Sequence, residues 1–125
     1  MVPVFLASLA SSQAQWLAAR QTTIASNVAN ANTPGYQARD ITPFNAVLDQ
    51  TSLSLASTNP MHLDPGADLA PSQKISKTDS WEIFHSGNSV ALEQEMMKAG
   101  EVNQSYALNT AIVKAFSRMV SMSAK

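Results

Sequence analysis

The residues best suited to acid–base or metal chemistry are His62, Asp64 and His85. His62 and Asp64 stand close together in the run 62-HLD-64, which brings two kinds of metal ligand into one short segment. The spacing is not specific, and the surrounding segment has no pattern that would build a shaped pocket. Local hydrogen bonding in a turn is the better interpretation, so we expect no metal site and no acid–base catalysis here.

The sequence contains no motif of a serine, phosphate-binding or cysteine active site. The many serines include no Gly-x-Ser-x-Gly run, and the four glycines at 35, 66, 87 and 100 are too scattered to form a phosphate-binding loop. The chain has no cysteine, which excludes disulfides, thiolate metal sites and cysteine nucleophiles. We therefore expect neither an enzyme nor a bound cofactor.

Composition narrows the class of protein further. A chain of 125 residues is the size of one domain, and 8 basic against 9 acidic residues give a net charge of −1. Nucleic-acid binding needs a clustered basic excess that is absent here, so we expect no such partner. No apolar run is long enough for a membrane span. The apolar segment from Met1 to Ala7 contains no lysine or arginine, whereas a signal peptide has a basic residue ahead of its apolar part. We therefore expect no cleaved signal peptide.

A first amphipathic helix is predicted over residues 5–32. Arg20 is its only charged residue, so its polar face is either a surface that meets other protein or an ordinary solvated face. Trp16 lies one step off the apolar stripe, as the edge of a core or as an anchor into a partner. The stripe itself, with steps mostly of three and four, consists of Leu6, Ala10, Ala14, Leu17, Ile24, Val28 and Ala31.

The run 26-SNVANANTPGY-36 ends this helix abruptly. Pro34 pushes the residue before it out of helical conformation, and Gly35 readily takes a positive φ, so the pair suits the centre of a type II turn. Buried asparagines are costly unless they are hydrogen-bonded. We therefore expect Asn27, Asn30 and Asn32 to specify the register between helices.

An irregular middle segment follows over residues 33–88. Residues 36–44 are predicted to fold back on the helix as a short extended or turn segment, and residues 45–49 to form one helical turn. Polar residues and prolines indicate a loop over 50–80. The β-forming residues Trp81 to Phe84 favour a small strand or hairpin, closed by a turn at 86–88.

A second long helix is predicted over residues 89–124, with Asn88 or Ser89 as its cap because Ala91 cannot cap. The first of its two apolar stripes contains Leu92, Met96, Ala99, Tyr106, Val113 and Val120, and the second contains Leu108, Ile112, Ala115, Met119 and Met122. One partner helix can cover only one stripe, so we expect α-helical neighbours on more than one side.

Together these residues carry a resemblance to a known family. The run 26-SNVANANTPGY-36 resembles the N-terminal signature of flagellar rod and hook proteins, Asn-x-Ala-Asn-x-x-Thr-Pro-Gly-Tyr. The runs 36-YQARDI-41, 58-TNPMHL-63 and 87-GNSVALEQEM-96, with the short length, are similar to the proximal-rod members. The resemblance implies a mainly all-α fold, a single domain over 1–125 in which the terminal helices pair as an antiparallel coiled coil.

The resemblance also implies a function. It indicates a structural subunit of the periplasmic rod of the bacterial flagellum, required for motility and exported by the flagellar type III apparatus. Its implied partners are further copies of itself, other rod subunits, the basal-body component that joins rod to membrane ring, and the export apparatus. The alternatives are another rod or hook subunit, which would need a larger middle domain, and a soluble helical adaptor or chaperone dimer.

The residues expected to mediate assembly come from both predicted helices and from the turn after the first. We expect the stripes from Leu6 to Ala31 and from Leu92 to Val120 to pair within one subunit, and the isolated chain to be weakly helical until it polymerises. The full set is Leu6, Trp16, Leu17, Ile24, Asn27, Val28, Asn30, Asn32, Pro34, Gly35, Tyr36, Leu92, Met96, Tyr106, Ile112, Val113, Phe116 and Val120.

Overall fold

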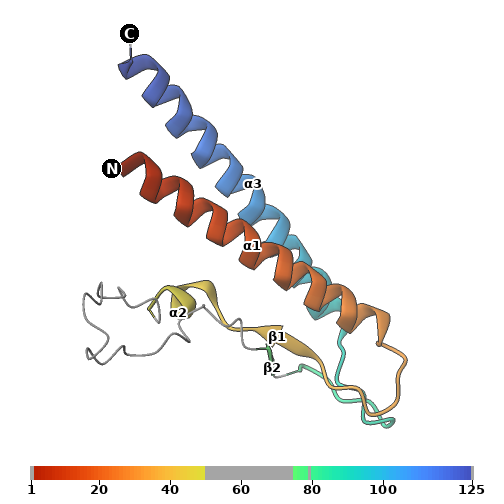
Figure 1. Ribbon diagram of the computed structural model, residues 1–125. Helices are drawn as coiled ribbons and strands as arrows, with labels where there is room; N and C mark the ends of the chain where they lie inside the picture. The colour runs from red at the N-terminus through yellow and green to blue at the C-terminus, as the bar shows by residue number, and fades with distance from the viewer. Residues whose placement is uncertain (1, 50–74, 79, 125) are drawn as a thin grey trace, which may run out of the picture.

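The structure is a computed structural model that describes residues 2–49, 75–78 and 80–124. Two long helices lie side by side, and both chain termini are at the same end of the pair, so the helices are antiparallel (Figure 1). A smaller layer of one short helix and two short strands lies against α1. The elements in chain order are α1 (Val2–Ala29), β1 (Arg39–Ile41), α2 (Phe44–Asp49), β2 (Ile75–Lys77) and α3 (Leu92–Ser123). The predicted, mainly α-helical fold with two long terminal helices is confirmed.

The core between the helices is small. Leu17 and Ile24 on α1 pack against Val102 on α3, and the partly buried Trp16 and Ala99 pack around them. Ala10 is also buried, beside Asn109, whose Nδ2 donates to the Ala10 carbonyl oxygen at 3.1 Å. The apolar stripe predicted for the first helix therefore faces its partner over most of its length.

The face of α3 that packs on α1 differs from the predicted one. Leu92, Met96 and Tyr106, from the stripe expected to pair within the subunit, are 47%, 73% and 56% exposed. The buried residues of α3 are instead Glu95, Lys98, Val102 and Asn109. The prediction holds for Ala99, Val113 and Val120, which lie on the side of α3 that faces α1. It was wrong for Leu92, Met96 and Tyr106, because it assumed an apolar contact face, whereas α1 and β1 supply hydrogen-bonding partners for polar residues of α3.

The turn after α1 has the predicted chemistry. The backbone N–H of Tyr36 donates to the Thr33 carbonyl oxygen at 3.2 Å, and Gly35 has φ of 72°. Pro34 and Gly35 therefore occupy the central positions of a type II turn. α1 itself ends at Ala29, before Asn32, because residues 30–32 already form turns.

The extended segment after the turn folds back on α1 as predicted and continues into α2. β1 pairs antiparallel with β2, with Arg39 opposite Lys77 and Ile41 opposite Ile75. The strand or hairpin expected at Trp81 to Phe84 is not formed, since these residues belong to no strand. Their backbone instead leads into a turn in which Gly87 N–H donates to the Phe84 carbonyl oxygen at 2.8 Å.

The start of α3 also differs from expectation. Its N-cap is Ala91, which makes no side-chain capping bond. The two predicted caps have other partners: Asn88 Oδ1 accepts the N–H of Val90, and Ser89 Oγ accepts the N–H of Ala38, each at 2.8 Å. Both side chains are used to hold the entry of α3 against the segment that leaves α1.

Candidate assembly interface

Asn27 connects three elements at one buried point. Its Nδ2 donates to the Arg39 carbonyl oxygen on β1 at 2.7 Å and to Glu95 Oε2 on α3 at 3.1 Å. Its Oδ1 accepts the N–H of Arg39 at 3.1 Å and the hydroxyl of Tyr36 at 3.3 Å. The side chain is 0% exposed, and these four bonds use the full capacity of a carboxamide. Asn27 therefore defines the relative positions of α1, β1 and α3 within one subunit.

Asn88 joins the segment that follows α1 to the segment that precedes α3. It is 1% exposed, and its Nδ2 donates to the carbonyl oxygens of Asn30 and Thr33 at 2.8 and 2.7 Å. Nearby, Gly35 N–H donates to the Ser86 carbonyl oxygen at 2.9 Å. A Cβ on Gly87 would lie 3.5 Å from the Gly35 Cα, so the two turns are in contact. The two segments form one tightly bonded junction.

The other two asparagines of the motif act locally or not at all within the subunit. Asn30 Nδ2 donates to the Ser26 carbonyl oxygen at 2.8 Å, and its Oδ1 accepts the Thr33 hydroxyl at 3.2 Å, so it closes the last turn of its own helix. Asn32 is exposed. Within the subunit, only Asn27 of the three bonds across to the other long helix.

Charged side chains add ion pairs between α1, β1 and α3 next to this junction. Glu95 is 0% exposed and accepts from Lys98 Nζ at 3.0 Å, while that ammonium group lies 3.8 Å from Asp40 Oδ2. Arg20, the single charged residue of α1, binds Asp40 through Nε and Nη2 at 3.3 and 3.2 Å and reaches Glu101 Oε2 at 3.3 Å. Among the described residues no buried side-chain nitrogen or oxygen lacks a partner, as a stable buried network requires.

Trp16 is an anchor inside the subunit. Its Nε1 donates to the Thr42 carbonyl oxygen at 2.8 Å, and its ring centroid lies 5.9 Å from that of Phe44 at the start of α2. The Arg20 guanidinium lies 5.6 Å from the same ring, within cation–π range. Of the two interpretations of Trp16, the structure therefore supports the edge of the core.

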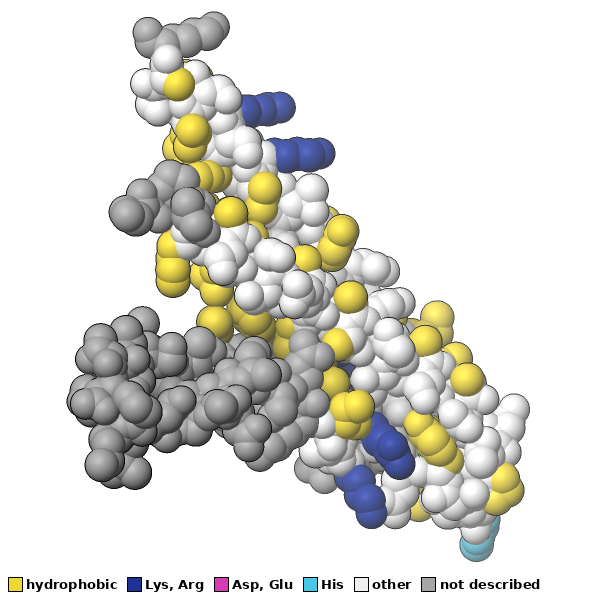
Figure 2. Space-filling model, viewed as in Figure 1, with side chains coloured by type: hydrophobic (Ala, Val, Ile, Leu, Met, Phe, Trp, Pro, Cys, Tyr) yellow, Lys and Arg dark blue, Asp and Glu magenta, His cyan; other side chains and the backbone are white. Residues whose placement is uncertain are grey.

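The predicted second stripe of α3 is not covered by α1. Its large members Leu108, Ile112, Met119 and Met122 are 61%, 45%, 60% and 77% exposed. Figure 2 shows hydrophobic side chains running along the upper part of the helix pair. Scattered apolar residues are normal on a protein surface, but a stripe of this length on one helix is typical of a surface that binds other protein.

The helix pair opens into an apolar groove near the termini. Its volume is about 390 Å³, and its walls are Leu6 and Ala7 from α1 and Val113, Phe116 and Val120 from α3. Val113 and Val120 continue the face of α3 that carries Val102 and Asn109, yet they are 40% and 41% exposed. Four predicted assembly residues, Leu6, Val113, Phe116 and Val120, therefore meet in one place.

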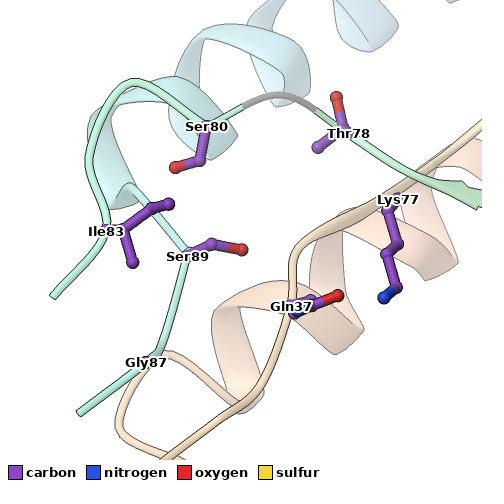
Figure 3. Close-up of a pocket in the computed structure, with 7 residues that line it drawn as sticks. All are labelled: Gln37, Lys77, Thr78, Ser80, Ile83, Gly87 and Ser89. Atoms are coloured by element: carbon purple, nitrogen blue, oxygen red, sulfur yellow. The ribbon is translucent and has the colours of Figure 1, made fainter. Parts of the chain in front are cut away.

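A polar pocket of about 450 Å³ lies at the other end, between β2 and the turn before α3. Figure 3 shows Lys77, Gln37, Ser80 and Ser89 around it, with Ile83 on one side. Lys77 is the single ionisable side chain among its described lining residues. Its described lining thus offers one ammonium group and several neutral polar side chains.

The histidine hypothesis can be followed only in part. His85 is exposed on the turn before α3, while His62 and Asp64 lie outside the described residues. No cluster of three or more metal-ligating side chains occurs in the described part of the chain. None of its described helices combines the length and the apolar character that crossing a membrane requires.

The contacts that several residues of the junction make between elements were not predicted from the sequence; the residues are Arg20, Asp40, Asn88, Glu95, Lys98 and Asn109. One signal was available: Arg20 is the only charge on a long helix, and such a charge needs a partner when that helix is packed. Glu95 gave no such signal, because an acidic residue in the first turn of a helix is common and usually exposed.

Comparison with known proteins adds an independent finding. Residues 10–37, which include most of α1 and the turn motif, match the family described as flagella basal body rod protein. A flagellar basal body rod protein FlgB from Agrobacterium fabrum (strain C58 / ATCC 33970) is 44% identical over 132 aligned residues, covering 100% of this chain and 96% of the relative. The proteins of the same name from Escherichia coli (strain K12) and Shigella flexneri are each 31% identical over 100 residues, covering 74% of this chain and 72% of theirs.

Proposed function

This chain belongs to the FlgB family of flagellar basal body rod proteins and is a structural subunit of the proximal rod, and from that premise we propose how its surface takes part in assembly. The hydrogen bonds around Asn27 hold the two long helices in one register, so that each subunit has a defined shape within the rod. The exposed apolar residues of α3 then pack against neighbouring rod subunits. The role is structural and involves no catalysis.

One observation carries this proposal: α3 has an apolar stripe on the side that α1 leaves uncovered. Leu108, Ile112 and Met119 are each between 45% and 61% exposed. Because these side chains are already about half buried, completing their burial in an interface is favourable by about 1 kcal/mol each. Around them the helix is poor in charge, with Lys114 and Arg118 as its only charged residues after Glu101. A surface of this kind suits helix-to-helix contacts in a tube.

The finer features of this role extend the proposal. The rod lies in the periplasm, and the chain reaches it through the flagellar export apparatus without cleavage of a signal peptide. Its partners are further copies of the chain, the other rod subunits and the basal-body component that joins the rod to the membrane ring. In the assembled rod the antiparallel helix pair forms a coiled coil with its neighbours, in which the uncovered stripe of α3 is buried.

The proposal is tested by adding a charge to the uncovered stripe. Ile112→Glu places a carboxylate in the expected interface, whereas Asn103→Glu adds the same charge to an exposed site nine residues earlier, on the opposite side of α3. In a strain that lacks the chromosomal copy, we expect Asn103→Glu to restore swimming in soft agar and Ile112→Glu to fail. Isolated basal bodies should contain the Asn103→Glu variant and lack the Ile112→Glu variant.

Two results would contradict this function. Full motility of the strain without any copy of the gene would show that the chain is not a necessary rod subunit. Sedimentation of the purified chain as a discrete dimer at every concentration would favour the alternative of a soluble adaptor, since a rod subunit should remain monomeric or form open-ended assemblies.

A further inference from the structure

The methionines of α3 are unusually exposed. Methionine is among the residue types most often found fully buried in folded proteins. Those in the described part of this chain all lie on α3, and each is more than half exposed: Met96 73%, Met97 56%, Met119 60% and Met122 77%. Because the chain has no cysteine, thioether groups supply its only sulfur atoms. The described sulfur atoms therefore all belong to exposed side chains of one helix.

Two of these methionines belong to the uncovered stripe of α3. Met119 follows Ile112 by seven residues, which is close to two helical turns, and Met122 lies almost one turn further on. The stripe is the surface that we propose to pack against neighbouring rod subunits, so its two thioethers are open to solvent only until a subunit is incorporated. Met96 is displaced from Met119 by about 140° around the helix axis and lies outside the stripe.

Hypochlorous acid converts an exposed thioether to a sulfoxide without an enzyme. In the net reaction an S–O bond forms and the O–Cl bond of hypochlorous acid breaks. The two electrons that the sulfur loses leave with chloride, and one proton is released. Methionine sulfoxide is polar, and methionine sulfoxide reductases return it to the thioether. The reaction therefore changes an apolar side chain into a polar one in a reversible way.

We propose that oxidation of Met119 and Met122 to sulfoxides keeps a free subunit of this chain out of the rod. This inference rests on the proposed packing of the uncovered stripe against neighbouring subunits. A sulfoxide oxygen buried beside Leu108 and Ile112 loses its hydrogen bonds to water, and the apolar side chains offer none in return. An oxidised subunit is excluded until a reductase restores its thioethers, whereas the neighbours of an incorporated subunit shield them from the oxidant.

The test induces the chain during a short exposure to hypochlorous acid, in the strain that lacks the chromosomal copy. Compared with untreated cells, we expect newly made chain in isolated basal bodies to fall by about fivefold or more. Mass spectrometry of the unassembled chain should find both Met119 and Met122 as sulfoxides. Met119→Leu with Met122→Leu keeps the apolar volume without sulfur, so its incorporation should be unaffected by the oxidant. Met96→Leu is the matched control and should remain as sensitive as the wild type.

Glutamine variants provide a second test that needs no oxidant, since glutamine places a polar group of similar length at the same site. Met119→Gln with Met122→Gln should reduce incorporation in untreated cells by about fivefold or more, and Met96→Gln should reduce it less. The inference is overturned if subunits with both sulfoxides are incorporated normally, or if the leucine pair is as sensitive to the oxidant as the wild type. It is also overturned if both thioethers stay unoxidised in the unassembled chain.

Failure of the proposed function would look different. Oxidation of Met119 as fast in isolated basal bodies as in the unassembled chain would show that neighbouring subunits do not cover the stripe. Motility without any copy of the gene would refute the rod function itself. Protection of Met119 in basal bodies, together with normal incorporation of oxidised subunits, would overturn only the inference about oxidation.

Discussion

Replacing Asn27 with leucine tests whether the amide of this residue holds the two long helices in register. Leucine has nearly the same size but removes the bonds to the Arg39 backbone, the Tyr36 hydroxyl and the Glu95 carboxylate. Each neutral bond contributes about 1 kcal/mol and the bond to a carboxylate about 1.5–3 kcal/mol. Leucine regains about 1–2 kcal/mol through its buried apolar surface, so the expected net loss is about 3–4 kcal/mol.

The assay is urea unfolding followed by far-ultraviolet circular dichroism, with trimethylamine oxide present to favour the folded state of the isolated chain. Because the slope for small proteins is about 1–3 kcal/mol per M urea, the midpoint should fall by about 2 M. Asn30→Leu is the matched control, since the side chain of Asn30 bonds only within its own turn and the substitution keeps the carbonyl that Asn88 binds. It should lower the free energy of unfolding by at most about 1 kcal/mol. Equal midpoints for the two variants would refute the reasoning.

Three further predictions use the same measurement. Gly100→Ala should stabilise the chain by about 1 kcal/mol, because Gly100 lies inside α3 with open space at its Cβ position. Gly35→Ala should instead destabilise the chain by about 1–2 kcal/mol, because Gly35 has a positive φ. Equal effects of the two substitutions would contradict this prediction. Lys98→Met should cost about 3–5 kcal/mol by leaving Glu95 buried without its cation, and adding Glu95→Gln should recover part of that loss. Trp16→Phe should cost about 1 kcal/mol by removing one hydrogen bond, and an unchanged midpoint would show that this bond contributes nothing.

Features that depend on neighbouring residues were predictable from the sequence. The type II turn follows from Pro34 and Gly35, whose backbone preferences act without help from the rest of the chain. The helical stripe of α1 was also predictable, since Leu17 and Ile24 are apolar and face the partner helix. The surplus of apolar surface on α3 followed from counting stripes, and it is exposed as expected.

Features that depend on distant partners were not predictable. Part of the contact face of α3 was assigned wrongly because Glu95 and Lys98 have the residue types of a solvated surface, and their partners lie far away in sequence at Asn27 and Asp40. β1 and β2 have three residues each, too short for an alternating pattern to stand out. Trp81–Phe84 has strong β-forming residues, but a strand also needs a partner, and residue type alone does not provide one.

The hydrogen bonds of Asn27 also oppose sliding of one long helix along the other. A slip of one helix along the other by a single turn would move the contact atoms by about 5.4 Å and break the bond to Glu95. The apolar core alone would resist such a slip weakly, because Leu17, Ile24 and Val102 can exchange one apolar neighbour for another. When the rod turns under load, we therefore expect the bonds of Asn27 to resist shear between the two long helices of each subunit.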